Sequence, residues 1–418
     1  MPQRTAIAIS LILTSSLALA QQKTVTVFGN FTGQDQQSFQ KVINAFEAKN
    51  PGIKVNYTGS ADFVTLINVR VQAGNYPDIA AIPQPGVMYD LAQKGVLVPL
   101  WNSALTLVKR NYSPAWLDLG TAEDGKAYGI FHRVNVKGLV FYNKTAFKNA
   151  GYKVPKTWPE LQALTKKMAA TKTAPWCIGI ESGGATGWAA TDWLENILLR
   201  TAPASVYDKW ITNKVKFDSP EVRKAWGVLD DIVTTPGYVY GGKTTVAVTN
   251  FRDASQGVYA NPAKCWMNLQ GSFATGFLQD DVQANLDKEV GVFMLPMIDE
   301  KLPTTLEVGG DQYVVFKGKD RPEVKKFMEF LATGASAAPW AADGGALFPH
   351  KDQNRKAYKT QLEQSFVRIL LSAKAARFDA SDAMPSAVNL AFWKGTTDYF
   401  TGKNLDQVLK DIDAAYGK

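Results

Sequence analysis

Aromatic residues lie close to polar residues in several stretches that also contain glycine or turn-forming residues. These pairings are Trp188 with Asp192, Trp266 with Asn268 and Gln270, Tyr313 with Asp311, and Trp340 with Asp343. A ring can stack on the apolar C–H face of a sugar, while amides and carboxylates pair with its hydroxyls. Each ring taken alone is as well explained by packing in the core. Together the pairings predict a site for a neutral ligand rich in hydroxyl groups.

Motifs for catalysis or metal binding are not found in the sequence. The two histidines, His132 and His350, are neither close to a cysteine nor paired at helical spacing. The segment 120–126 resembles a phosphate-binding loop, but Ala127 stands where a serine or threonine is required, so a turn is predicted. Glycoside hydrolysis needs two carboxylates at a defined separation in space, which the sequence does not give. We therefore predict no catalytic residue, cofactor or metal ligand, and keep a secreted carbohydrate-active enzyme as an alternative.

The N-terminus has the pattern of an export signal. Arg4 precedes an apolar run from Ala6 to Leu13, and Ala18-Leu19-Ala20 supplies a small-x-small cleavage pattern. The run is shorter than the roughly 20 residues that span a bilayer. Residues 1–20 are predicted to be a signal peptide cleaved after Ala20. With no cysteine at that point to carry a lipid anchor, a periplasmic or extracellular location follows.

The first hundred residues alternate short apolar runs with helical periodicity. Runs at 24–28, 53–57 and 78–82 predict strands, and helices are expected between and after them. This β-α-β-α-β order is typical of a parallel sheet with covering helices. Ligands bind beyond the carboxyl ends of such strands, which points to the loops that follow them. The candidate residues in these loops are Asn30, Phe31, Ser60, Asp62, Phe63 and Gln84.

The remaining chain predicts a second lobe. A strand is expected over 134–142, followed by helices at 158–170, 190–199 and 220–233 and strands at 290–295 and 313–316. A chain of 418 residues exceeds the size at which a single core stops growing, so two domains are expected. No repeat or linker separates them, which suggests that the chain crosses between lobes more than once.

The cysteine count and the net charge bear on the disulfide content of the protein and on its binding partners. An even count of two, Cys177 and Cys265, predicts a disulfide in an exported chain, with two buried thiols as the alternative. The formal net charge is +8, but the basic residues are scattered, without a long run. Nucleic-acid binding is therefore not predicted.

Five motifs together resemble one known family. They occupy residues 59–63, 76–86, 175–182, 264–270 and 377–385. With them, nearly the whole mature chain resembles family 1 solute-binding proteins of carbohydrate ABC importers, the maltose-binding-protein-like group, and most closely its α-glucoside-binding subgroup. The group's Asn-Gly-Pro-Trp motif appears here as Gln270-Gly-Ser-Phe273. The smaller ring there implies a ligand of one or two sugar units.

The resemblance implies an α/β, two-lobed periplasmic-binding-protein fold (type II), each lobe a mostly parallel sheet with helices on both faces. The N-terminal lobe would comprise 21–132 plus 308–347, and the C-terminal lobe 133–307 plus 348–418. Three hinge segments would cross near 130–135, 304–309 and 345–350. Such lobes close around a ligand by hinge bending. The implied function is capture of a small sugar by a monomer, without catalysis, and its delivery to a membrane permease.

The resemblance also assigns site residues to each lobe. The first lobe would supply Ser60, Asp62, Phe63 and Gln84, and the second Trp188, Asp192, Trp266 and Gln270. Gly310, Asp311, Gly344 and Gly345 would line the cleft near the later crossings, and Arg377 and Asp379 would complete its rim or pair with each other. A binding protein for a polyamine or a metal chelate is the other alternative, although the mixed Asn, Gln, Ser and Asp side chains suit neutral hydroxyls better.

Overall fold

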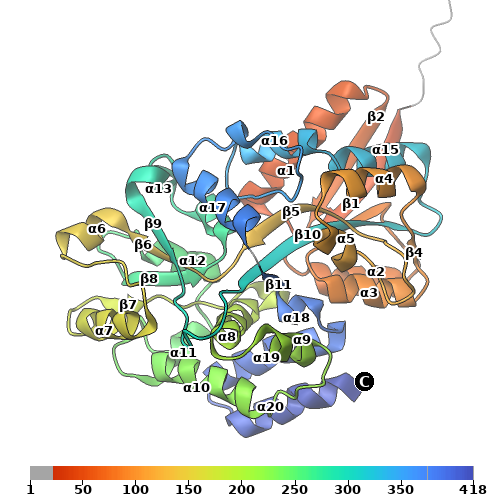
Figure 1. The fold of residues 1–418 in the computed structure, drawn as a ribbon. Coiled ribbons are helices and arrows are strands. Elements are labelled where there is room, and N and C mark those ends of the chain that lie inside the picture. The colour runs from red at the N-terminus through yellow and green to blue at the C-terminus, as the bar shows by residue number, and fades with distance from the viewer. Residues whose placement is uncertain (1–21, 374, 418) are drawn as a thin grey trace, which may run out of the picture.

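Two β-sheets, each covered by helices, form the body of the protein (Figure 1). The computed structural model describes residues 22–373 and 375–417, so the predicted signal peptide and its cleavage site lie outside the described residues. Within these ranges, no helix combines the length and the apolar character needed to cross a membrane.

The first sheet contains seven strands in the described residues, and the second contains four. The strands of the first sheet are β1 (Lys23–Gly29), β2 (Ile53–Gly59), β3 (Ile79–Ile82), β4 (Leu97–Val98), β5 (Ile130–Val136), β10 (Leu306–Phe316) and β11 (Ala376–Phe378). Those of the second are β6 (Leu139–Asn143), β7 (Ala174–Trp176), β8 (Cys265–Gln270) and β9 (Val290–Met294).

The helices follow the strands in a mixed order. They are α1 (Gly33–Lys49), α2 (Phe63–Gln72), α3 (Pro85–Gln93), α4 (Asn102–Asn111), α5 (Pro114–Leu119), α6 (Lys144–Asn149), α7 (Trp158–Ala169), α8 (Trp188–Thr201), α9 (Ala204–Ile211), α10 (Pro220–Thr234), α11 (Lys243–Val246), α12 (Phe251–Gly257), α13 (Asp280–Gln283), α14 (Leu286–Glu289), α15 (Pro322–Leu331), α16 (Gly334–Ala341), α17 (Gln361–Ser372), α18 (Ala380–Ala383), α19 (Ser386–Phe400) and α20 (Leu405–Ala414).

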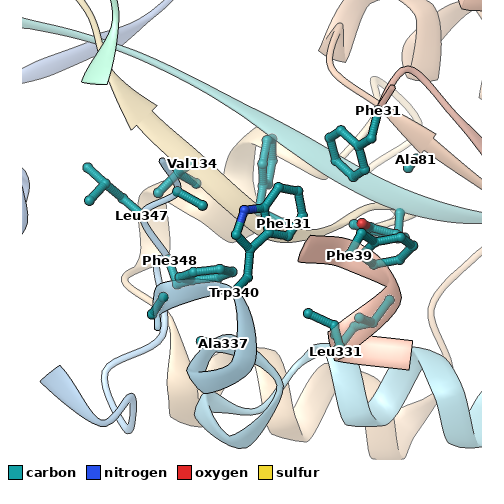
Figure 2. Packing of buried hydrophobic residues seen from close by; sticks show 14 of the residues in the cluster. Phe31, Phe39, Ala81, Phe131, Val134, Leu331, Ala337, Trp340, Leu347 and Phe348 are labelled. Atoms are coloured by element: carbon teal, nitrogen blue, oxygen red, sulfur yellow. The ribbon is translucent and has the colours of Figure 1, made fainter. Parts of the chain in front are cut away.

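The alternating side chains of β1 show how the first sheet acquires helices on both faces. Val25 and Val27 point into a core shared with α1, α15 and α16, while Phe28 packs on the opposite face with α2 and α3. Figure 2 shows part of the first core, where the Phe31 ring lies edge-on to Trp340 at a centroid distance of 5.0 Å. The prediction of an α/β fold with helices on both faces is confirmed.

The strand directions correct one detail of the predicted fold. β1 is parallel to β2 and β3, but β10 is antiparallel to β3, β4 and β5. In the second sheet β7 and β8 are parallel, whereas β6 is antiparallel to both β8 and β9. The sheets are therefore mixed and not mostly parallel. The reason in the first sheet is that β10 re-enters it from the second lobe and so runs opposite to β3.

The chain passes from the first sheet to the second between β5 and β6 and returns between β9 and β10, near two of the three predicted crossings, whereas the strand that follows the third, β11, still belongs to the first sheet. The single strand expected over 134–142 is two strands, because the chain leaves β5 and turns at Gly138, where φ is +73°. A Cβ atom at Gly138 would lie 1.8 Å from Asn196 Oδ1, so only glycine fits this turn. The predicted lobe boundary at 132/133 falls inside β5, and β11, from the stretch assigned to the second lobe, pairs with β10 in the first sheet.

The predicted disulfide is present. Cys177 and Cys265 are bonded, with a Cα–Cα distance of 5.5 Å, and both are buried beside Ala254 and Val258. Cys177 directly follows β7 and Cys265 begins β8, so the bond ties these neighbouring strands together where α12 packs on them.

Candidate functional site

A cavity of about 190 Å³ lies between the two lobes. Its first-lobe wall comes from the loops after β1, β2 and β3, and its second-lobe wall from the segments 182–188, 251–252 and 273–277. Residues of β5, β10 and the start of α18 complete it at the crossings. Sites for drug-sized ligands usually measure about 300–1,000 Å³, so this cavity suits a smaller molecule.

Aromatic rings form the second-lobe wall. The Trp188 ring lies 5.0 Å from that of Phe251 and 5.9 Å from that of Phe273, measured between centroids. Gly187, with φ of +116°, caps the N-terminus of α8 directly before Trp188 and packs against the carbonyl of Trp393, where a Cβ atom would lie 2.2 Å from the oxygen. This close approach fixes Trp188 at the cavity wall, where its ring can stack on an apolar ligand face.

Arg133 on β5 is a buried cation at the cavity wall. Its guanidinium lies 3.4 Å from Asp35 and 3.6 Å from Asp311. It also lies over aromatic rings, 5.1 Å from the Trp340 centroid and 5.3 Å from that of Phe31. Burial raises the pKa of Asp311 to about 6, although Arg133 opposes this shift.

Lys137 is a second buried cation, at the crossing that follows β5. Its ammonium donates a hydrogen bond to Asp192 at 2.7 Å and another to Asp379. Burial raises the pKa of Asp192 to about 7, whereas the Lys137 ammonium and neighbouring donors hold the pKa of Asp379 below its usual value despite burial. These two ion pairs thus connect the end of β5 with α8 and with the segment after β11.

Several buried polar atoms at the cavity have no hydrogen-bond partner among the described residues. They are Asn30 Oδ1, Gln84 Oε1, Arg133 Nε, Asn135 Oδ1 and Trp393 Nε1. Buried polar groups are nearly always paired in folded proteins. Both donors and acceptors are left over, which is the complement that hydroxyl groups satisfy because each hydroxyl can donate and accept.

The structure brings half of the sixteen predicted ligand-binding residues to this cavity. The residues that line it are Asn30, Phe31, Phe63, Gln84, Trp188, Gly310, Asp311 and Asp379. Two others, Ser60 and Asp62, lie at its edge, where Ser60 Oγ accepts a hydrogen bond from the Asp62 amide. Asp192 lies behind the wall, bonded to Lys137.

The other predicted residues have different contacts. Trp266 packs edge-on against Tyr152, with ring centroids 4.8 Å apart. Gln270 is buried and its side chain accepts from the Gly271 amide. Gly344 and Gly345 adjoin Glu363, which accepts from the Gly345 amide at 2.9 Å. Arg377 forms an ion pair with Asp208 and not with Asp379.

Sequence reasoning missed most of the charged residues of the cavity. Arg133 and Lys137 lie on β5 and at its end, on either side of the neutral Asn135, and Asp35, Arg252 and Asp382 also line the cavity. Their signal was present, because residues 130–142 form an otherwise apolar run interrupted by polar residues. A charge inside such a run is seldom buried without a partner or a function.

Three buried carboxylates form a group that resembles a metal site. Oxygens of Asp192, Glu307 and Asp379 lie within 4.8 Å of one another. The ammonium of Lys137 already contacts Asp192 and Asp379. A cation is thus supplied by the chain itself, and the group is better described as an ion cluster at the crossings.

Comparison with known proteins decides the family. A profile of the bacterial extracellular solute-binding proteins matches residues 32–338. The chain belongs to this family. It is 38% identical over 398 residues to an osmoprotective compounds-binding protein of Synechocystis, which covers 94% of this chain and 93% of the relative. It is 37% identical over 401 residues to an α-glucosides-binding periplasmic protein of Rhizobium meliloti, which covers 94% and 87%.

Solved structures of solute-binding proteins share the fold. A chitin oligosaccharide binding protein superposes with a TM-score of 0.81 at 22% identity, covering 95% of this chain and all of the other. A maltose-bound protein of Thermotoga maritima superposes with a TM-score of 0.70 at 18% identity, covering 94% and 98%. At these identities the likeness shows the fold alone, and it confirms the predicted two-lobed periplasmic-binding-protein architecture.

Proposed function

We propose that this member of the family is the substrate-binding subunit of an ABC importer for a small neutral sugar. It is exported after cleavage behind Ala20 and acts as a monomer in the periplasm or outside the cell. An α-glucoside of one or two rings enters the cleft, the lobes close, and the loaded protein delivers the sugar to the permease. No chemical step is part of this cycle.

The pairing of the two buried cations of the cavity carries the proposal. Arg133 lies between Asp35 and Asp311, and Lys137 lies between Asp192 and Asp379. At these two positions a phosphorylated ligand would find no free buried cation and a polyamine no free carboxylate, and an unpaired charge is costly to bury. Arg252 also lines the cavity, but it is only partly buried and lies over the Phe251 and Phe277 rings. Neutral hydroxyls can instead use the unpartnered amide, guanidinium and indole groups without disturbing either ion pair.

The rings and the cavity size support a glucoside of limited length. Trp188 offers a stacking surface, and Phe273 stands where the resemblance to the maltose-binding-protein-like group implies a larger ring. One relative is named an α-glucosides-binding protein and another an osmoprotective compounds-binding protein. Closure is favoured only by contacts that the ligand makes better in the closed form. Walls from both lobes supply such contacts.

A thermal-shift screen of the mature protein tests this function. The ligands are trehalose, maltose, sucrose, palatinose and glucose, with sn-glycerol 3-phosphate and spermidine as charged comparisons. A ligand at one hundred times its Kd adds about 2.7 kcal/mol of stability, which raises the Tm visibly. We expect a shift with at least one neutral α-glucoside, recovered intact, and none with the charged compounds. A shift with a charged compound alone, or hydrolysis of the sugar, would contradict the proposal.

Two tryptophans provide a matched pair of variants for the same screen. Trp188 lines the cavity, whereas Trp266 packs against Tyr152 outside it. Trp188→Ala should lose most of the sugar-induced shift, because the stacking surface is gone. Trp266→Ala should keep the shift, although its own Tm falls. The opposite ranking would place the sugar elsewhere in the molecule.

A further inference from the structure

One hydrogen bond joins the two lobes directly at the edge of the cavity. Asp62 lies in the turn between β2 and α2, and its Oδ1 accepts from the backbone amide of Gly184 at 2.9 Å. Gly184 belongs to the short 3₁₀ turn Gly183–Ala185 that precedes α8. The two residues are 122 positions apart in the chain, and one follows a strand of the first sheet while the other adjoins the second.

The neighbours of this bond show where it lies. Ala61 and Phe63, on either side of Asp62, line the cavity, and so do Ser182 and Ala185, on either side of Gly184. Asp62 and Gly184 themselves do not line it and are exposed. The bond therefore spans the edge of the cavity on its solvent side, where separation of the lobes would break it.

We propose that Asp62 is a positioning residue, which holds the lobes closed over a bound ligand and does not contact the ligand. This inference rests on the proposed function and deepens it. Because separation of the lobes would break the bond, it adds to ligand affinity by shifting the closure equilibrium. The bond should therefore slow the dissociation of the ligand and have little effect on its association.

Both partners are shaped for this contact. A Cβ atom on Gly184 would lie 2.7 Å from Asp62 Oδ1, so a side chain there would push the carboxylate away. The turn is held by Glu181, which accepts from the Gly183 amide at 2.8 Å and from Asn250 at 2.6 Å. On the other side, Ser60 Oγ accepts from the Asp62 amide at 3.1 Å and fixes the turn that carries the carboxylate.

The experiment compares sugar kinetics of the wild type with those of Asp62→Ala, Asp62→Asn and Gly184→Ala. The control is Asp118→Ala, which removes an exposed carboxylate of α5 that forms no ion pair among the described residues. Stopped-flow tryptophan fluorescence gives both rate constants for the sugar found in the screen. We expect Asp62→Ala and Gly184→Ala to raise the dissociation rate about tenfold, the loss of one hydrogen bond to a charged group. Association should change less than twofold.

The conservative variant Asp62→Asn distinguishes a role in holding the lobes closed from a general structural role. Asp62→Asn keeps an acceptor oxygen for the Gly184 amide, so its dissociation rate should lie between those of wild type and Asp62→Ala. The Tm of the ligand-free protein should be unchanged in all variants. A faster dissociation in Asp62→Ala with a wild-type dissociation rate in Gly184→Ala would overturn the inference and make Asp62 a ligand contact, because losing a direct contact also raises the dissociation rate.

A second measurement keeps the inference testable if no sugar binds. Spin labels on Lys49→Cys in the first lobe and Lys214→Cys in the second report the distance between lobes, and both native cysteines are bonded to each other. In the ligand-free protein, Asp62→Ala should move the distance distribution toward longer values than in wild type and in Asp118→Ala. Identical distance distributions would overturn the inference that Asp62 holds the lobes closed. Absence of any sugar response with a shifted distribution would instead contradict only the proposed ligand class.

Discussion

The two buried cations of the cavity are held in different ways. Arg133 has ion-pair distances of 3.4 and 3.6 Å, and its Nε atom has no partner among the described residues. Lys137 contacts Asp192 at 2.7 Å and also hydrogen-bonds Asp379. The guanidinium thus keeps a donor for a ligand, whereas two of the three ammonium donors are already used. We infer that Arg133 serves recognition and Lys137 serves the junction between lobes.

The largest expected effect is on the junction. Lys137→Met leaves Asp192 and Asp379 buried without their cation, and breaking a buried pair by removing one partner costs about 3–5 kcal/mol. We expect urea denaturation to show a loss of this size. Asp192→Asn combined with Lys137→Met should recover part of it, because one of the two stranded carboxylates is then neutral. An unchanged urea midpoint for Lys137→Met would contradict the inference that Lys137 stabilises the junction between the lobes.

The next effect is on pH dependence. The pKa of Asp192 is raised to about 7, so between about pH 4 and 7 the folded protein holds a proton that the unfolded chain has lost. This carboxyl group therefore contributes a loss of stability as pH rises, of about 1.4 kcal/mol per pH unit within that window. Asp192→Asn should flatten that part of the profile in urea titrations at several pH values. Asp311→Asn provides the comparison, because the pKa of Asp311 is about 6 and its contribution to the pH dependence of stability ends near that pH. The same slope in wild type and Asp192→Asn would contradict the assignment.

A smaller effect is expected on recognition. Arg133→Lys keeps a positive charge between Asp35 and Asp311 but removes the planar fork and its unpartnered Nε. Loss of a hydrogen bond to a charged group should weaken sugar binding roughly ten- to a hundredfold. Calorimetry of the sugar found in the screen measures this, with the unfolding free energy as the control. Unchanged affinity would exclude Arg133 from the site.

The smallest effect is expected at Glu307. Burial raises the pKa of this carboxyl group well above its usual value, which favours its protonated form, and both of its oxygens lack partners among the described residues. Glu307→Gln then replaces one neutral group with another of similar shape. We expect the unfolding free energy at pH 7 to change by less than about 1 kcal/mol. A loss of several kcal/mol would show that Glu307 is ionised and shares Lys137 with the other two carboxylates.

Much of the fold could be predicted because local patterns determine it. The first three strands follow from β-branched runs, and α1 follows from Phe39, Val42, Ile43 and Phe46 at helical spacing. The antiparallel entry of β10 could not be predicted, because it depends on contacts between residues more than two hundred positions apart. Strand direction is a property of the whole chain path and leaves no local signature.

The lining of the cavity could be predicted where the residues directly follow strands, as Asn30 and Gln84 do. Tryptophans were less informative. Trp188 and Trp266 have similar polar neighbours in the sequence, yet one lines the cavity and the other packs on Tyr152. The buried cations were missed because an isolated Arg or Lys is usually exposed. Only the three-dimensional structure shows that Asp35, Asp192, Asp311 and Asp379 surround them.

The late position of β10 has a consequence for the order in which the protein can fold. This strand pairs with β3, β4, β5 and β11, so it occupies the middle of the first sheet (Figure 1). Residues 306–316 emerge only after almost three quarters of the chain, and until then β3 and β5 have no strand between them. Folding that waits for such distant pairing is slow. If the chain is exported as proposed, this slow pairing would leave it unfolded while it passes through an export channel, and the native sheet would form on the far side of the membrane.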